Sequence, residues 1–288
     1  MHGGSKRRVF PGWVLAILAA GSLAACDDGG GGGPGTDTGT ALFLHHSTGE
    51  AIWNGGVEGW FGAYNSANAT SYVVNQVNYP DEPYPWENYP YDYWNLWVEH
   101  AGSSRFEGQE TLDMLAPRYD LIVFKHCFPV SMVEEDTGSP DVASSTRSLE
   151  NYRLQYQALK TKLRSFTGKR FLVWTGAALT ETALLGDYGG TLAHAARARE
   201  FFTWVKDEWD ESGDNIFLFD FFELETEGGD TFVEAYAQDP TDPHPNEGFA
   251  QAVAPRFGQR VVDVLEGRGD TGSLTLAGEI DPDGYLRL

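Results

Sequence analysis

The chain has 288 residues, of which 42 are acidic and 20 are Lys or Arg, and its formal net charge is −22. This acidity argues against binding to nucleic acid and against electrostatic docking on anionic lipid, because both are themselves negatively charged. Hydrophobic residues make up 41% of the chain and aromatic residues 14%, which suits one large domain with a substantial core.

Residues 1–25 have the pattern of a targeting segment. Lys6, Arg7 and Arg8 precede a short apolar run, WVLAILAA, and the sequence LAAC then ends at Cys26. The run is too short to cross a bilayer, which takes roughly 20 apolar residues. Small residues directly before a cysteine resemble the lipobox of bacterial lipoproteins, in which the cysteine is acylated. We therefore predict a signal peptide and a lipid anchor at Cys26, with an ordinary secretory signal as the alternative.

Either interpretation places the protein outside the cytoplasm. The lipoprotein interpretation places it in a bacterial cell envelope, anchored to a membrane and facing the extracytoplasmic side. If Cys26 carries lipid, the one other cysteine, Cys127, has no partner for an intramolecular disulfide, so the core must hold the fold.

The segment after Cys26 predicts a flexible tether. Its sequence, DDGGGGGPGTDTGT, has no apolar residue and no periodicity, and its root-mean-square reach is about 20 Å. We expect the tether over residues 26–40, a single folded domain over 41–267 and a C-terminal extension over 268–288.

Five short apolar segments predict β-strands. Three of them are nearly continuous in apolar residues, which is typical of parallel strands covered on both faces. The segments are Ala41–Leu44, Ser71–Val77, Asp120–His126, Arg170–Gly176 and Asn215–Phe222.

Three segments between and after these strands have a helical period. They cover residues 147–166, 192–209 and 246–265, the last beginning at Asn246 as its N-cap. Pro255 lies inside the last segment and predicts a kink or a separate short turn. Alternating strands and helices predict an α/β sandwich with a parallel sheet, in which sites form at the carboxyl ends of strands.

Two stretches carry chemistry-bearing residues. HHSTG follows the first predicted strand directly and makes Ser47 a candidate nucleophile, although a Ser-Thr pair also commonly caps a turn. Near the other end of the chain, Asp239 and Asp242 precede His244. A carboxylate orients a histidine through one ring nitrogen while the other accepts a proton. His244 as a plain loop residue beside a proline is the alternative.

The serine motif after the first strand, with a late aspartate and HPN before the last helix, resembles the SGNH hydrolases, also called GDSL-type esterases and lipases. The resemblance runs from Ala41 to about Gly267. It implies a flavodoxin-like three-layer α/β/α sandwich with a five-stranded, mostly parallel sheet. It also implies that Ser47 attacks an ester carbonyl, that His244 accepts its proton and that an aspartate orients His244, with no metal or organic cofactor.

The sequence departs from the family pattern at both blocks. His45 and His46 stand where the family has Gly-Asp before the serine. The family places its aspartate three residues before the histidine, where this chain has Thr241. Some relatives that act on acyl groups of polysaccharides place it two residues before the histidine, so the resemblance implies Asp242 as the orienting residue, with Asp239 as the alternative.

The donors that would stabilise an oxyanion are less well matched. The Ser47 amide is one candidate, and the resemblance implies a glycine as another, for which Gly108 fits the pattern better than Gly102. The family's Gly-x-Asn-Asp is missing, because FKHCFPVS follows the third strand instead. His126 or Lys125 is the candidate replacement for its asparagine.

Other residues have alternative interpretations. The histidines 45, 46, 126 and 244 as zinc ligands are disfavoured, because adjacent strand residues point to opposite faces. We predict that Cys127 is a small core residue rather than a nucleophile. The aromatic stretch Tyr79–Trp97 predicts a long ordered loop that either covers the core or stacks on sugar rings, and that roofs the active site if it does both.

The sequence predicts an extracytoplasmic serine esterase that hydrolyses a carboxylic ester, such as an acyl group on a carbohydrate, through an acyl-enzyme. The expected partners are this substrate and the membrane reached through Cys26. Two rivals remain: a glycan-binding lipoprotein that has lost its chemistry on the same scaffold, and an acyltransferase that uses the same residues.

Overall fold

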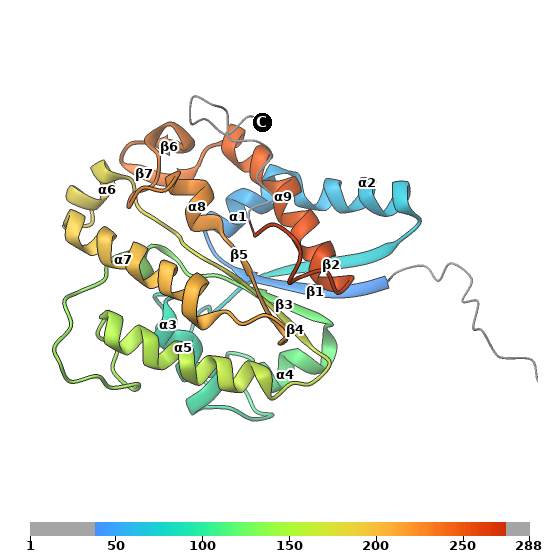
Figure 1. Cartoon of the computed structure of the whole chain (residues 1–288), viewed down its shortest axis with the longest axis horizontal. Helices are drawn as coiled ribbons and strands as arrows, with labels where there is room; N and C mark the ends of the chain where they lie inside the picture. Colours follow the sequence, from blue (N-terminus) through green and yellow to red (C-terminus); the bar gives the residue numbers. More distant parts are fainter. Residues whose placement is uncertain (1–37, 275–288) are drawn as a thin grey trace, which may run out of the picture. The chain divides into compact units, whose positions relative to one another are not determined.

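The computed structural model describes residues 38–274, which form a five-stranded sheet in the order β2-β1-β3-β4-β5 (Figure 1). Every neighbouring pair of these strands is parallel. This is the order of flavodoxin-like α/β folds, so the predicted fold class is confirmed. The strands are β1 (Thr38–His45), β2 (Ser71–Asn78), β3 (Leu121–Phe124), β4 (Arg170–Trp174) and β5 (Ile216–Phe219).

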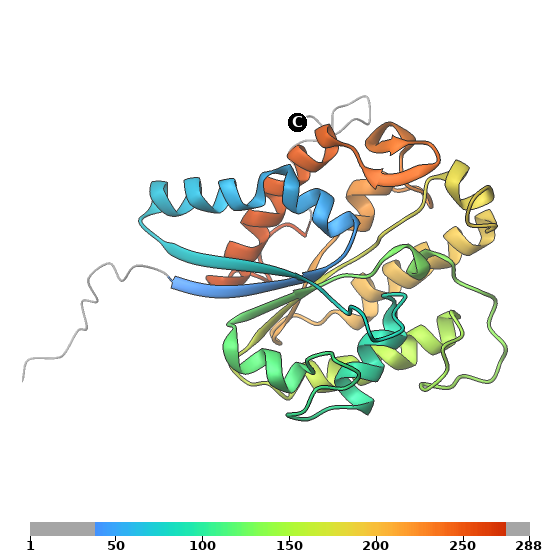
Figure 2. The same ribbon diagram turned by 180° about the vertical axis from the view of Figure 1, so that it is seen from behind.

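Helices cover both faces of the sheet and complete the three layers (Figures 1 and 2). One face carries α1 (Thr48–Ile52), α2 (Glu58–Asn68) and α9 (Glu247–Leu265), with the π-helical turn η1 (Trp53–Val57) between the first two. The other face carries α3 (Pro90–Trp94), α4 (Leu112–Leu115), α5 (Leu149–Arg164) and α7 (Leu192–Trp204). Short helices α6 (Glu181–Leu185) and α8 (Phe221–Thr226) follow β4 and β5.

The predicted start of the domain is corrected by three residues. β1 begins at Thr38 because Thr38–Thr40 pair with the first residues of β2. Thr40 also donates two hydrogen bonds of 2.9 Å, from its amide and its hydroxyl, to the Asp120 carboxylate. These residues are strand and not tether. The predicted signal peptide, Cys26 and the earlier part of the tether lie outside the described residues.

The predicted fifth strand is too long. β5 ends at Phe219, and Asp220 then caps α8 by accepting a 3.3 Å hydrogen bond from the Glu223 amide. Phe221 and Phe222 are therefore helical, although their apolar character alone made them look like strand residues.

The three predicted long helices are present. α5 lies within its predicted range, and α7 continues into a π-helical turn, η5 (Val205–Trp209), that ends where the prediction did. Asn246 caps α9 as predicted, accepting a 2.9 Å hydrogen bond from the Phe249 amide. α9 runs through Pro255 without interruption, so no separate turn precedes it.

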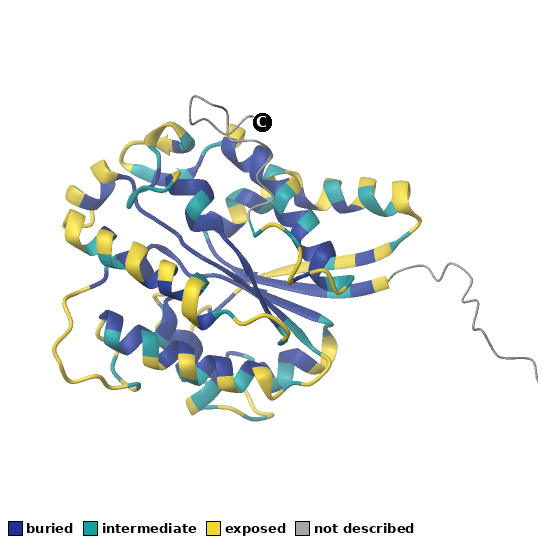
Figure 3. Ribbon diagram, in the orientation of Figure 1, coloured by how far each residue is buried: buried dark blue, intermediate teal, exposed yellow. Residues whose placement is uncertain are grey.

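The core lies on both faces of the sheet, and β3 and β5 are buried along their whole length (Figure 3). Trp174 on β4 is fully buried and contacts Phe43 of β1 and Phe257 of α9, with ring centroids 4.9 and 4.7 Å away. β2 forms the exposed edge of the sheet, where Val73 and Val77 face solvent.

The aromatic stretch begins as a loop and ends in helix α3 and the π-helical turn η2 (Asn95–Glu99). Most of its rings are buried in the main core, as the covering interpretation predicts. The buried rings are Tyr79, Tyr84, Tyr89, Tyr93, Trp94 and Trp97.

The described part of the C-terminal extension packs back onto the domain. Arg260 of α9 donates a 2.8 Å hydrogen bond to the Gly269 carbonyl, and the Asp220 amide donates one of 3.0 Å to the Leu274 carbonyl. Among residues 38–274, no helix is both long enough and apolar enough to cross a bilayer.

Candidate active site

Ser47 stands on a strained turn at the carboxyl end of β1. Its backbone has φ 49° and ψ −101°, a region that residues other than glycine seldom adopt and that recurs at functional sites. Ser47 precedes α1, but its side chain makes no capping hydrogen bond. Instead its Oγ is hydrogen-bonded to His244 Nε2, which rules out the plain capping interpretation.

A short antiparallel hairpin, β6 (Ala237–Asp239) and β7 (Asp242–Pro245), carries His244 to Ser47. Two side chains outside the strands hold it. Asn246 Nδ2 donates to the carbonyls of Ala235 and Ala237 at 2.8 and 3.2 Å. Thr180, at the start of α6, donates a 2.6 Å hydrogen bond to the Pro240 carbonyl at the hairpin turn. The hairpin therefore has fixed supports on both sides of His244.

Asp242 is the aspartate that contacts His244. His244 Nδ1–H donates to Asp242 Oδ1 at 2.5 Å, and the His244 amide donates to the same oxygen at 3.1 Å. Asp239 has a different task, because its Oδ1 accepts from the amide and hydroxyl of Thr241, both at 2.7 Å, and from the Asp242 amide at 3.0 Å. It shapes the turn that presents Asp242.

Ser47, His244 and Asp242 thus form one hydrogen-bonded series across 197 residues of chain. The carboxylate fixes the ring so that Nε2 faces the serine hydroxyl, which is the geometry needed to take a proton from a nucleophile. The side chains of His244 and Asp242 are 34% and 43% exposed, so the series opens to solvent.

His45 and His46 are engaged away from the nucleophile. His45 Nε2 is 2.6 Å from Gln76 Oε1, and His46 Nε2 donates to the Pro80 carbonyl. The His46 ring also stacks on Trp86, with centroids 3.9 Å apart. Burial lowers the pKa of His45 to about 4 and also lowers that of His46. No group of three or more His, Cys, Asp or Glu side chains placed to hold a metal occurs within residues 38–274.

His126 and Lys125, the two candidates to replace the family's asparagine, send their side chains to opposite sides of the sheet. His126 is fully buried, and its Nε2 is 2.7 Å from the Tyr156 hydroxyl of α5, on the far side of the sheet from α1. Its prediction as an oxyanion donor is wrong. Lys125 lies beneath the Ser47 turn and is 1% exposed, with Nζ 3.3 Å from the His46 carbonyl oxygen and 3.7 Å from Cys127 Sγ. It is too deeply buried to reach a substrate directly. Cys127 is a free, buried cysteine, as predicted.

The predicted glycine donors are also placed elsewhere. The Gly102 amide donates a 2.9 Å hydrogen bond to the Asp113 carboxylate and is therefore not available to an oxyanion. Gly108 packs against Pro83 so closely that a Cβ would lie 2.8 Å from its Cδ. It lines a pocket of about 370 Å³ to which neither Ser47 nor His244 contributes. Both glycine predictions are corrected, because each residue serves its own loop.

The Ser47 amide is the remaining predicted donor at the nucleophile. Its N–H donates to no acceptor within residues 38–274, whereas the carbonyl of Ser47 accepts a 2.9 Å hydrogen bond from the Ala51 amide. The amide is thus available to a bound oxygen.

Three aromatic residues lie beside the series, of which Phe128 and Tyr188 were not assigned to the site from the sequence. The ring of Phe128 meets that of His244 edge-on at 5.2 Å, and Tyr188 meets Phe128 at 6.1 Å. Trp86 reaches the site through its stack on His46. Trp86 belongs to the aromatic stretch that stood out in the sequence, whereas no spacing marks Phe128 or Tyr188.

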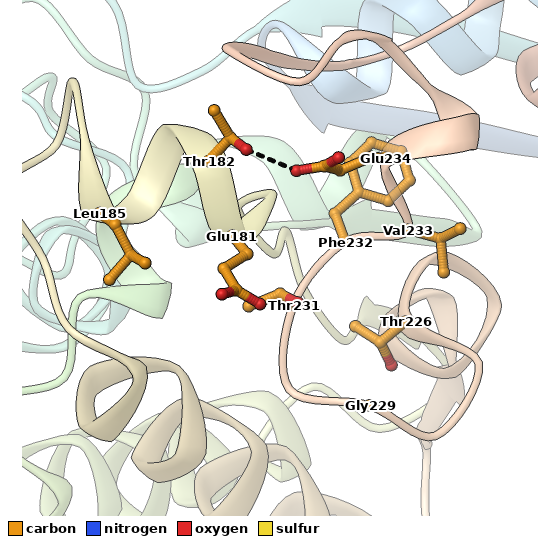
Figure 4. Close-up of a pocket in the computed structure, with 9 residues that line it drawn as sticks. All are labelled: Glu181, Thr182, Leu185, Thr226, Gly229, Thr231, Phe232, Val233 and Glu234. Carbon is orange, nitrogen blue, oxygen red and sulfur yellow. Dashed lines mark hydrogen bonds between the residues drawn. The ribbon is translucent and has the colours of Figure 1, made fainter.

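A separate pocket of about 470 Å³ lies between α6 and the segment before the hairpin (Figure 4). Thr182 donates a 2.6 Å hydrogen bond to Glu234 across its mouth. It shares no residue with the Ser47 series. Its lining consists of Glu181, Thr182, Leu185, Thr226, Gly229, Thr231, Phe232, Val233 and Glu234.

No protein-family model matches the sequence, and no curated protein matches it. Among solved structures, one similar chain is a gut microbial diltiazem-metabolizing enzyme, with 11% identity and a TM-score of 0.45 over 81% of this chain. The match spans 48% of that enzyme, about half its length. Another is a mutant of an acetyl-xylooligosaccharide esterase from Geobacillus, with 12% identity and a TM-score of 0.40 over 83% of this chain and 97% of that one.

Proposed function

We propose that the protein is a serine esterase of SGNH type that hydrolyses carboxylic esters through an acyl-enzyme. The observation that carries the proposal is the hydrogen-bonded series from Asp242 through His244 to Ser47. Its members come from both ends of the domain and meet at the carboxyl end of β1, where ligands bind in open α/β sheets.

Acylation begins when Ser47 Oγ attacks the ester carbonyl carbon and His244 Nε2 takes the hydroxyl proton. The carbonyl oxygen becomes an oxyanion, and the Ser47 N–H is placed to donate to it. Asp242 stabilises the resulting imidazolium through Nδ1. When the tetrahedral intermediate collapses, the alcohol leaves with the proton from His244, and the acyl group stays on Ser47.

Deacylation repeats the same steps with water as the nucleophile. His244 takes a proton from water, the water oxygen attacks the acyl carbon, and the second collapse returns the proton to Ser47 Oγ. The series is open to solvent through His244 and Asp242, so water can reach the acyl group on Ser47.

An acyl group on a carbohydrate is the substrate class that we favour. Trp86 is partly exposed beside the Ser47 turn and carries a flat face suited to a sugar ring. The same stretch lines a pocket of about 500 Å³, where the partly exposed Tyr91 offers a ring and the exposed Glu87 offers a carboxylate that suits sugar hydroxyls. Its lining includes Tyr84, Glu87, Tyr89, Tyr91, Asp92 and Arg147.

The proposed location is a bacterial cell envelope, with the domain held to a membrane by lipid on Cys26 and facing the extracytoplasmic side. The lipobox-like sequence before Cys26 and the glycine-rich segment after it support this part of the proposal. When a bacterial host is grown with radiolabelled palmitate, we expect the wild-type protein to incorporate the label and Cys26→Ala to lose it.

Labelling with a fluorophosphonate probe tests the chemistry, because it needs nucleophile, base and oxyanion donors together. The wild-type protein should be labelled on the peptide that contains Ser47 and should hydrolyse a short p-nitrophenyl ester. Ser47→Ala and His244→Ala should lose both activities at an unchanged melting temperature. Ser66→Ala, an exposed serine on α2, is the matched control and should keep both.

A folded wild-type protein that neither reacts with the probe nor hydrolyses esters would overturn the proposal. Labelling at another serine would do the same. Glycan binding by such an unreactive protein would favour the non-catalytic scaffold instead.

A further inference from the structure

Lys125 is a lysine buried directly under the nucleophile turn. It follows the last residue of β3, which pairs with Leu44 of β1. Its side chain is 1% exposed and runs beneath Gly49, where a Cβ would lie 2.9 Å from Lys125 Cδ. A lysine is almost never fully buried without a specific partner, so this placement needs an explanation.

The partner of Lys125 is the peptide group that precedes the nucleophile. Nζ is 3.3 Å from the carbonyl oxygen of His46. That oxygen also accepts a 2.8 Å hydrogen bond from the Gly49 amide. The nitrogen of the same peptide group is the Ser47 amide, whose N–H has no acceptor within the described residues. One end of this peptide thus accepts two hydrogen bonds, while its other end is free to donate.

We propose that Lys125 is a positioning residue of the esterase reaction, which polarises the His46–Ser47 peptide and strengthens the Ser47 N–H as the oxyanion donor. The inference rests on the proposed function. The physical basis is the resonance of the peptide bond, which couples its oxygen to its nitrogen. A donor at the oxygen draws electron density from the N–H, so hydrogen bonds in series strengthen one another.

The same contact fixes the strained conformation of Ser47. The turn needs φ 49° at Ser47, and such conformations persist when the surroundings over-determine them. Two donors hold the His46 carbonyl, and the absence of a side chain at Gly49 leaves room for the lysine stem. Lys125 therefore fixes both the direction and the donor strength of the Ser47 amide.

Lys125 takes no proton and makes no covalent bond in this role. As Ser47 Oγ bonds to the carbonyl carbon, the electron pair moves onto the substrate oxygen, and the Ser47 N–H donates to it. The proton from Ser47 goes to His244 as before. Burial lowers the pKa of Lys125, whereas Cys127 and the buried Glu225 act in the opposite direction. The amine and the ammonium both carry N–H groups, so the contact with His46 forms in either state.

The test is Lys125→Met, which keeps the stem and removes the N–H donors. We expect kcat for ester hydrolysis to fall at least about tenfold with KM unchanged, less than the about 10²- to 10³-fold cost of deleting an oxyanion donor outright. The affinity for a trifluoromethyl ketone, which forms a tetrahedral oxyanion on Ser47, should fall by the same factor as kcat. A non-hydrolysable ether analogue of the substrate should bind as to wild type, because it carries no oxyanion.

Two variants control for the loss of a buried amine and of a neighbour. Lys160→Met removes another buried lysine, whose Nζ is 2.8 Å from Glu211 and far along the sequence from the site. Cys127→Ala removes the second contact of Lys125 Nζ while leaving its contact with His46. Both should keep wild-type kcat.

Wild-type kcat and ketone affinity in a folded Lys125→Met protein would overturn the inference while leaving the proposed function intact. A parallel loss of ether and ketone affinity would also overturn it, because that pattern means general damage to the site. Failure of the proposed function would give a different result, because the wild-type protein itself would then hydrolyse no ester.

Discussion

The ends of β1 and β3 lie side by side at one edge of the sheet, and the chain places similar residues on both. β1 leads into His45, His46 and Ser47, while β3 leads into Lys125, His126 and Cys127. The β1 end turns through a positive φ and delivers a hydroxyl to His244. The β3 end stays buried and sends its side chains to opposite sides of the sheet. Of these residues, only the one that a turn lifts out of the core, Ser47, is presented to a substrate.

The largest expected effect distinguishes Asp242 and Asp239, the two aspartates of the hairpin that presents His244 to Ser47 at the β1 end. Asp242→Asn should lower kcat by about 10⁴-fold, because an amide at this position favours the wrong tautomer of His244. Asp239→Asn should change kcat little, since its amide oxygen still accepts hydrogen bonds at the turn. Steady-state hydrolysis of a p-nitrophenyl ester measures both. A larger loss in Asp239→Asn than in Asp242→Asn would contradict the assignment of roles.

The next effect concerns Gly49, where the two strand ends come closest. A Cβ at Gly49 would lie 2.5 Å from His45 Cβ and 2.9 Å from Lys125 Cδ. Gly49→Ala should lower the free energy of unfolding by about 1–3 kcal/mol, the usual cost of overpacking, and should lower kcat by displacing the Ser47 turn. Thermal denaturation and ester hydrolysis report these two effects.

Gly59→Ala is the matched control for Gly49→Ala. Gly59 lies in α2, and apart from its chain neighbours and the helix backbone no atom lies within 4 Å of the place that a Cβ would take, so alanine should raise stability by about 0.5–1 kcal/mol without changing kcat. An unchanged melting temperature and activity in Gly49→Ala would show that the two strand ends are less tightly packed than the structure has them.

The sequence predicted the sheet and the two ends of the reactive series for clear physical reasons. Parallel strands buried on both faces are apolar throughout, which a linear pattern reveals. Ser47 and His244 each stand beside a marked boundary, the first after a strand and the second before the helix capped by Asn246. Their meeting then follows from the rule that strand ends share one edge of the sheet.

Oxyanion donors other than the Ser47 amide could not be predicted in this way, because they depend on where a backbone amide or a side chain points. Gly102 fits the pattern of a donor but gives its amide to Asp113. His126 and Lys125 are adjacent, yet one meets Tyr156 and the other His46. Nothing in the sequence reports which side of the sheet each of them occupies, because β3 ends just before them and the pleat no longer applies.

The smallest expected effect is on the pH dependence of stability, which tests whether the β3 end is buried. Burial lowers the pKa of His126 to about 3, so the folded protein keeps this ring neutral while the unfolded chain protonates it near pH 6.5. Between these values the unfolded state binds one more proton, and stability therefore falls as the pH falls.

His126→Gln removes this titration and retains a group that can bond to the Tyr156 hydroxyl. Its free energy of unfolding in urea should depend less steeply on pH between 4 and 6, by about 1.4 kcal/mol per pH unit. Carboxylates contribute equally to both proteins and cancel in the difference. Equal slopes would mean that His126 is already solvated in the folded state, and a large loss of kcat in His126→Gln would mean that His126 itself contributes to the site.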